Sequence, residues 1–160
     1  MRQGVLMRKV FSNTFKVARR HFSNNDDTCK VMFTKSHEYI KFEQNNVAKI
    51  GISSYASKSI GDVIFTEFTA EDEAIEKGQT IGILDSVKSV NEIYSPINGI
   101  ILEQNINVVD NPNIINKDSL GEGWLLKISC VEKSDPEFMD SKTYDKYVES
   151  VIMNELKYTR

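Results

Sequence analysis

One lysine lies at the centre of a strand–turn–strand pattern, where its amine could take part in chemistry. Two strand-like runs, Thr80–Val87 and Val90–Ser95, meet around Lys88. Turn-forming glycines stand at nearly equal distances on either side, at positions Gly78 and Gly99. This symmetry predicts a protruding hairpin with the lysine near its tip. A lysine there is exposed and free to be acylated, although position alone favours an ordinary charged residue on a tight turn.

The remaining reactive side chains do not form a convergent set. His21 falls in a basic leader, which leaves His37 as the one histidine of the rest of the chain. Cys29 and Cys130 are too few for a disulfide framework or a cysteine-based zinc site. Cys130 also ends a predicted strand, where a buried and unreactive cysteine is common. We therefore predict no catalytic residue and no metal site.

Composition describes one soluble globular domain. The chain has 160 residues, of which 40% are hydrophobic and 27% charged. No apolar run approaches the roughly 20 residues that span a bilayer. A net charge of −3 and a pI of about 5.5 argue against general nucleic-acid binding. We expect neither a membrane nor a nucleic acid among the partners.

The charge is unevenly distributed along the chain. Residues 1–22 carry six basic side chains and no acid, whereas the rest carries 14 basic and 23 acidic side chains. Apolar residues recur at helical spacing between Phe11 and Phe22. This amphipathic, acid-free leader predicts a mitochondrial transit peptide over 1–22 and a protein of the mitochondrial matrix. The alternative for residues 1–22 is a solvated basic arm. Residues 23–34 would be a flexible start of the mature chain.

The elements that must position Lys88 are mostly short strands. Alternation of apolar and β-branched residues predicts them near Glu38–Phe42, Val47–Ile52, Val63–Phe68, Thr80–Val87, Val90–Ser95, Gly99–Asn105 and Trp124–Val131. A short helix is predicted over Ser53–Ile60, with Ser53 as its cap and Gly61 ending it. Asp135 and Pro136 predict the start of a C-terminal helix over 137–157. The expected architecture is an antiparallel sandwich or flattened barrel.

Six sequence blocks stand in one order along the chain. The block around the lysine is Asp85-Ser86-Val87-Lys88 followed by Ser95-Pro96-x-x-Gly99. The others are Ser36-His37-Glu38-Tyr39, Ile50-Gly51-Ile52-Ser53, Gly61-Asp62-Val63, Asn111-Pro112-x-x-Ile115-Asn116 and Gly123-Trp124-Leu125-Leu126-Lys127-Ile128. Together they run from about Lys35 to Tyr147 and resemble the glycine cleavage system H protein family, which carries lipoate. The block around Lys88 is the strongest and resembles the family's lipoyl-attachment hairpin. Asp85 stands where the family usually has Glu, and Tyr39 where it usually has Trp.

The resemblance implies a mainly β, lipoyl/biotinyl-type flattened β-barrel or sandwich (hybrid-motif-like), formed by residues 35–160 with small helices and a C-terminal helix. It implies lipoate attached to Lys88 as N6-lipoyllysine. The polar positions that would line a cleft for the loaded arm are Ser36, Glu38 and Glu92. A carboxylate such as Glu38 could hold a cationic aminomethyl group by a charge-assisted hydrogen bond.

By the same resemblance the protein is a non-catalytic, monomeric carrier of the aminomethyl group of glycine. Its partners would be a pyridoxal-phosphate-dependent glycine decarboxylase, a folate-dependent aminomethyltransferase, dihydrolipoyl dehydrogenase and a lipoyl-attaching ligase or transferase. A lipoyl donor or relay that supplies 2-oxo-acid dehydrogenase complexes would use the same lysine and stays open. A biotin carrier is disfavoured because Val87 and Ser89 stand where methionines normally flank the lysine. A lipoyl domain of an acyltransferase would favour Asp-Lys-Ala. An enzyme in its own right is opposed by the scattered titratable residues.

Overall fold

The computed structural model describes residues 30–130 and 133–158. The predicted transit peptide therefore lies outside the described residues. The strands are β1 (Val31–Phe33), β2 (Glu38–Phe42), β3 (Val47–Ile52), β4 (Val63–Phe68), β5 (Ala74–Ile75), β6 (Thr80–Ser86), β7 (Val90–Tyr94), β8 (Gly99–Gln104) and β9 (Leu126–Ser129). The helices are η1 (Gln44–Asn46), α2 (Ser54–Ile60), α3 (Ile106–Asp110), α4 (Ile114–Lys117) and α5 (Ser141–Tyr158). None of these helices is both long and apolar enough to cross a bilayer, within the residues the structure describes.

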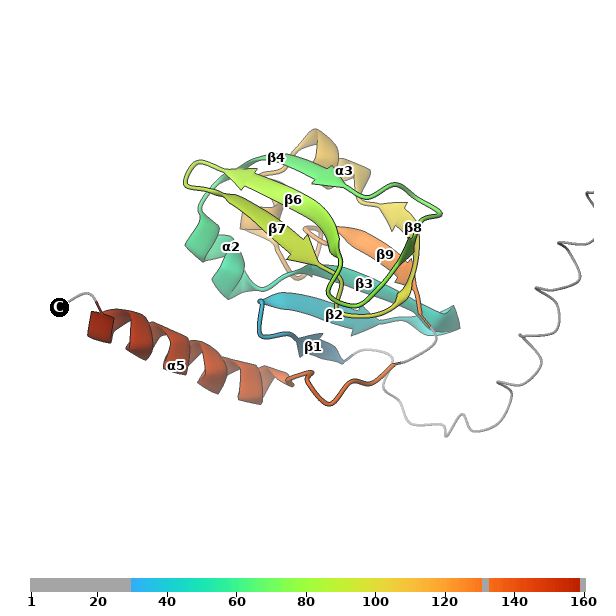
Figure 1. The fold of residues 1–160 in the computed structure, drawn as a ribbon. Coiled ribbons are helices and arrows are strands. Elements are labelled where there is room, and N and C mark those ends of the chain that lie inside the picture. The colour runs from blue at the N-terminus through green and yellow to red at the C-terminus, as the bar shows by residue number, and fades with distance from the viewer. Residues whose placement is uncertain (1–29, 131–132, 159–160) are drawn as a thin grey trace, which may run out of the picture.

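Two antiparallel sheets face each other across one core. Among the described strands, the larger sheet has the order β1-β2-β3-β9-β8-β5, and the smaller has the order β4-β6-β7. Figure 1 shows the smaller sheet lying over the β2, β3 and β9 part of the larger one, with helices at the edges. The fully buried core side chains come from both sheets: Ile40, Ile50, Ile81, Leu84, Ile101, Leu126 and Ile128. The predicted mainly β sandwich is confirmed, and its sheets remain open rather than closing into a barrel.

The core strands follow their apolar alternation closely. β2, β3 and β4 have the bounds that alternation predicts, and β6 to β9 differ from prediction only at their ends. In β6, Leu84 is fully buried whereas its neighbours Ile83 and Asp85 are partly exposed. One side of this strand therefore faces the core and the other faces solvent.

The helix α2 begins and ends as its sequence predicts. The Ser53 hydroxyl accepts a hydrogen bond from the Ala56 backbone N–H at 3.1 Å, which satisfies one of the first free N–H groups of the helix. Gly61 ends the helix with a φ of +79°, a conformation that side chains rarely adopt. This turn carries the chain directly into β4.

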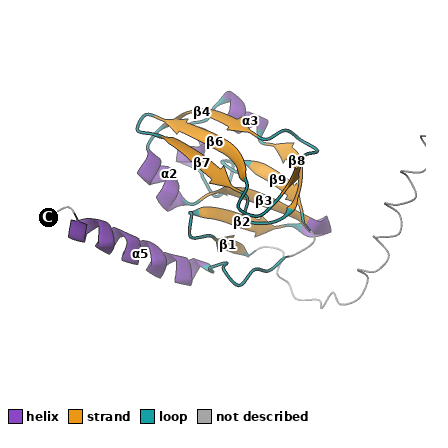
Figure 2. Ribbon diagram, in the orientation of Figure 1, coloured by secondary structure: helices purple, strands orange, loops and turns teal. Residues whose placement is uncertain are grey.

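Two boundaries differ from expectation. A strand, β1, lies inside the 23–34 segment for which we expected a flexible start, because it pairs with β2 and buries Phe33. The helix α5 begins at Ser141 rather than 137. The Asp140 carboxylate accepts from the Thr143 N–H at 2.9 Å and caps it, whereas Asp135 accepts from the Glu137 N–H at 2.8 Å in a separate turn. Figure 2 shows this helix extending along and beyond the edge of the sheet that β1 forms.

Candidate functional site

Lys88 lies in the turn between β6 and β7, as predicted, and a buried hydroxyl holds this turn together. Ser86 accepts hydrogen bonds through its hydroxyl oxygen from the backbone N–H groups of Lys88 at 3.3 Å and Ser89 at 3.2 Å. The same hydroxyl lies 2.8 Å from the Ile60 carbonyl and 2.9 Å from the Ser89 carbonyl, to which it can donate. One serine therefore fixes the turn and ties it to the end of α2.

The turn is also anchored to the loop that precedes β4. The Val87 N–H donates to the Asp62 carbonyl at 3.0 Å. Asn116, in α4, holds this loop from the other side: its amide donates to the Gly61 carbonyl at 2.8 Å and its carbonyl accepts from the Val63 N–H at 2.9 Å. Residues from three distant parts of the sequence thus fix the backbone under the lysine.

The Lys88 side chain itself is exposed, and its stem lies against Gly61. A Cβ placed on Gly61 would be 3.3 Å from Lys88 Cε, so only glycine leaves this path open without displacement. Within the described residues, its ammonium takes no part in the ion pairs, which all involve other lysines. The Nζ atom is therefore available to an acylating reagent.

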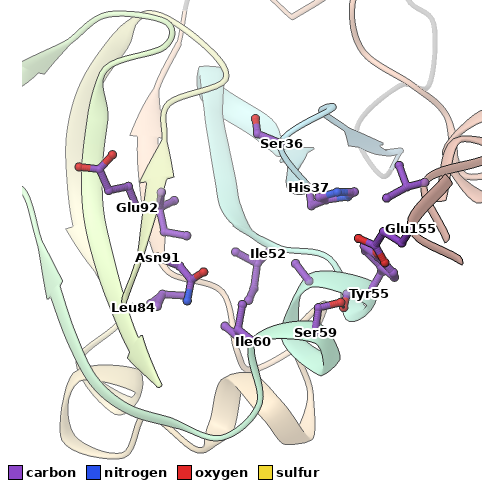
Figure 3. Close-up of a pocket in the computed structure, with 13 residues that line it drawn as sticks. Ser36, His37, Ile52, Tyr55, Ser59, Ile60, Leu84, Asn91, Glu92 and Glu155 are labelled. Atoms are coloured by element: carbon purple, nitrogen blue, oxygen red, sulfur yellow. The ribbon is translucent and has the colours of Figure 1, made fainter. Parts of the chain in front are cut away.

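A cavity of about 560 Å³ opens between α2 and the β6–β7 hairpin, a volume in the range of ordinary small-ligand sites. Figure 3 shows its walls, which come from β3, α2, β6, β7, the Ser36–His37 turn and α5. Apolar side chains form part of these walls: Ile52, Ala56, Ile60, Leu84, Ile93 and Val151. Of the lining residues, Ile60 directly precedes Gly61, against which the Lys88 stem lies, whereas Lys88 itself does not line the cavity.

Glu38 is buried and holds two strands together. It is 2% exposed, and its carboxylate accepts hydrogen bonds from the Thr34 hydroxyl, from the Ser36 hydroxyl at 2.7 Å and from the Tyr94 N–H at 3.2 Å. These donors come from β7 and from the turn before β2. Glu38 lines a second, smaller cavity of about 170 Å³ instead of the larger one.

The three predicted cleft residues are only partly brought together. Ser36 lines both cavities, whereas Glu92 lines the larger one and Glu38 the smaller. The Glu92 carboxylate accepts from the Tyr94 hydroxyl at 2.6 Å. In Figure 3 it points away from Ser36 and His37. Ser36 thus connects Glu38 to the larger cavity through its 2.7 Å hydrogen bond.

An aromatic cluster around His37 was not predicted as part of the site. His37 has a φ of +73°, and its Nδ1 lies 2.7 Å from the Tyr144 hydroxyl, which is in turn 2.7 Å from the Ser53 hydroxyl. Burial lowers the pKa of His37, and the charges of Glu38 and Glu155 oppose that shift. The network ties α5 to the cap of α2. The available sequence signal is the 3- and 4-residue spacing of Tyr144, Tyr147, Val148 and Val151, which is typical of a helix face that packs on a sheet and does not indicate a site.

Cys130 is a buried free thiol at the end of β9. Burial raises the pKa of its thiol, which keeps it in the unreactive protonated form. This environment agrees with the inert role expected for it.

Comparison with known proteins gives one answer throughout. The model of the glycine cleavage H-protein family matches residues 31–151. The glycine cleavage system H protein of Rhodospirillum rubrum is 37% identical over 120 residues, which cover 74% of this chain and 95% of the relative. That of Gloeothece citriformis is 40% identical over 115 residues, covering 72% and 86%. The crystal structure of a glycine cleavage system H protein from Mycobacterium marinum superposes with a TM-score of 0.66 at 25% identity, covering 76% of this chain and 95% of that one.

Proposed function

The chain belongs to the glycine cleavage H-protein family, and from this premise we propose that it carries lipoate on Lys88 and shuttles the aminomethyl group of glycine. The observation that supports this most directly is the position of Lys88. Its ammonium is exposed at the tip of a hairpin whose backbone is fixed from two sides. A rigid base with a free amine is what attachment of a swinging arm requires.

The residues around Lys88 suit a lipoyl group. Such a group supplies a dithiolane, whose chemistry is thiol–disulfide exchange and redox cycling. Acylation removes the lysine charge and places the ring at a reach of roughly 14 Å from the Cα atom. The apolar walls formed by Ile60, Leu84 and Ile93 can receive the aliphatic part of the arm. The stem of Lys88 already points past Gly61, which lies beside these walls.

Polar groups in the larger cavity can hold the cationic amine of the cargo. Because Ser36 donates its proton to Glu38, its oxygen keeps lone pairs that can accept from an ammonium. Glu38 acts here as a positioning residue, since it orients Ser36 without lining the cavity. Glu92 lines the same cavity, but its carboxylate points away from Ser36 and accepts from the Tyr94 hydroxyl. A held cargo would be shielded from water until a partner withdraws the arm.

As an H protein, this chain works together with the other components of the glycine cleavage system. In the proposed function the protein is a monomeric, non-catalytic carrier. It receives its cargo from the pyridoxal-phosphate-dependent decarboxylase and delivers it to the folate-dependent aminomethyltransferase. Dihydrolipoyl dehydrogenase then reoxidises the arm. A covalently attached substrate reaches each docked site at high effective concentration, which is the physical advantage of a carrier.

The charge of residues 1–22 supports a mitochondrial matrix location. Six basic residues without an acid suit import into an organelle with a negative interior, and the cut would fall near Ser23. The N-terminus of the protein isolated from its own cells tests this directly.

Mass spectrometry of the natively isolated protein tests the attachment. We expect a lipoyl adduct on the peptide that contains Lys88, and its loss in the Lys88→Arg variant, which retains the charge. That variant should also lose all support of glycine cleavage while keeping the melting temperature of the unmodified wild type. An unmodified Lys88 in cells that lipoylate other proteins would overturn the proposal.

A further inference from the structure

Four large apolar side chains are exposed around the Lys88 hairpin. Ile64 and Phe65 in β4 are 59% and 53% exposed, and Val87 and Val90 beside the lysine are 64% and 63% exposed. The pairing register of β4 shifts between Val63 and Phe65. This bulge leaves two consecutive side chains, Ile64 and Phe65, in solvent. Grouped exposed apolar residues on a soluble protein commonly mark an interaction site.

The strand register places Phe65 and Val90 in one row with an acid between them. Phe65 pairs with Asp85, and Asp85 pairs with Val90. Residues that are directly opposite across strands share a face of the sheet. Leu84 precedes Asp85 in β6 and is fully buried, so Asp85 and its row lie on the opposite, outer face of the smaller sheet.

The next row on this outer face continues the pattern. Glu67 pairs with Ile83, which pairs with Glu92. The face therefore alternates apolar side chains with three carboxylates, and β4, β6 and β7 contain no lysine or arginine. None of the three carboxylates takes part in an ion pair among the described residues. The complementary partner surface is apolar and basic.

The distance from the Lys88 Cα at which each partner enzyme acts indicates which of them this outer face fits. The enzymes that act on the dithiolane work roughly 14 Å from the Lys88 Cα and need not touch the hairpin. An acylating enzyme must instead reach Nζ, about 6 Å from the Cα. Asp85 and Val90 are three and two residues from Lys88, a chain distance of at most about 10 Å. An enzyme that reaches the amine would therefore also cover this row.

We propose that the outer face of β4, β6 and β7 is the docking surface for the enzyme that acylates Lys88. This inference rests on the proposed function. In the reaction, the lysine nitrogen loses a proton and attacks the carbonyl carbon of an activated lipoyl donor. The C–N bond forms, the bond from that carbon to the activating group breaks with its electron pair leaving on that group, and the nitrogen releases a second proton as the amide forms. Phe65 is the central contact, supplied by a strand remote in sequence from the lysine.

The test measures acylation of the unmodified full chain by a lipoyl-attaching ligase given lipoate and ATP, followed by mass spectrometry. Phe65→Ser and Val90→Ser should each lower kcat/KM by about tenfold or more, as expected for central interface residues. Leu102→Ser, a matched change at an exposed position of β8 on the other sheet, should stay within about twofold of wild type. A melting curve for each variant confirms that it folds.

A charge reversal provides an independent test that leaves the apolar residues unchanged. Glu67→Lys should lower kcat/KM and flatten its salt dependence, whereas Glu149→Lys, the same charge change on exposed α5, should do neither.

Wild-type rates in Phe65→Ser, Val90→Ser and Glu67→Lys would overturn the docking surface while leaving the proposed function intact. Normal lipoylation with loss of decarboxylase-dependent exchange in the lipoylated variants would assign this face to the decarboxylase and would equally overturn it. Failure of the wild type to become lipoylated on Lys88 would overturn both proposals.

Discussion

Replacing Glu38 by glutamine tests whether a buried carboxylate locks the turn before β2 to β7. The carboxylate is 2% exposed and accepts from two hydroxyls and the Tyr94 N–H. In Glu38→Gln, the amide oxygen can still accept from Tyr94, and the amide N–H groups can turn toward Thr34 and Ser36, whose hydroxyls can rotate to accept. The change therefore removes the charge while preserving the shape.

The cost follows from the difference between charged and neutral hydrogen bonds. Bonds to a charged group contribute about 1.5–3 kcal/mol each, against about 0.5–1.5 kcal/mol for neutral ones. Three such bonds are affected, of which the one to Tyr94 is long at 3.2 Å. We expect Glu38→Gln to lower the free energy of unfolding by about 2–3 kcal/mol.

Urea unfolding followed by Trp124 fluorescence and circular dichroism measures this change, and Trp124 is the one tryptophan of the chain. Glu67→Gln, at an exposed position in β4, is the matched control and should change the free energy by less than about 0.5 kcal/mol. A Glu38→Gln midpoint within that margin of wild type would refute the reasoning from burial and hydrogen bonding. On the lipoylated protein, the variant should also lose its aminomethyl cargo to water faster. Unchanged hydrolysis would remove Glu38 from cargo protection.

Three further changes probe the supports of the site. Tyr144→Phe keeps the ring stacked on Phe33 but loses its 2.7 Å contacts to His37 and Ser53, and should cost about 1–2 kcal/mol in urea unfolding; no loss would show that these contacts are not stabilising. Because burial lowers the pKa of His37 below the unfolded value of 6.5, stability is complete above that pH and falls as the pH drops from 6.5 through the folded pKa; unfolding titrations of wild type and His37→Gln should diverge in that window, and parallel curves would contradict the assignment. Gly61→Ala places a side chain at φ +79°, which should cost about 1–3 kcal/mol by thermal unfolding, and an unchanged melting temperature would count against strain there.

The strands of the core were predictable because a local pattern determines them. β2, β3 and β4 are rich in apolar and β-branched residues over a full strand length, and their observed bounds match the prediction. β1 and β5 were missed since each is too short to show a period. They exist because longer neighbours, β2 and β8, offer them hydrogen-bonding partners.

Helix boundaries show the same division between local and distant causes. The Ser53 cap and the Gly61 stop are local signals, and both were correct. Pro136 suggested a helix start. Instead, the Asp135 carboxylate forms an ion pair with distant Lys77 at 2.8 Å, and it also accepts from the Glu137 N–H in a local turn. The helix then begins behind its own cap, Asp140. A contact across 58 positions is invisible to a reading of neighbouring residues.

The candidate site shows the same division between local and distant causes. Lys88 was identifiable because glycine and strand signals bracket it and because the residues around it resemble the family's attachment hairpin. The placement of Glu38 against Tyr94, and of His37 against Tyr144, depends on how the sheets and α5 pack. Residue types there suggested polar roles, but only the fold shows that Glu38 lines the smaller cavity alone while Ser36 lines both.

The anchoring of the hairpin has a consequence for proteins other than this one. Hydrogen bonds fix the backbone at Lys88 to the rest of the domain through Ser86, Val87 and Asn116. The reach of the lipoyl arm therefore starts from a fixed point. The reacting atoms of every partner must then lie within about 14 Å of that point when the proteins are docked. A catalytic centre at the bottom of a longer tunnel could be reached only if the hairpin detached from Ile60 and Asp62. The fixed position of this short turn therefore limits how far below their surfaces the partner enzymes can bury their active sites.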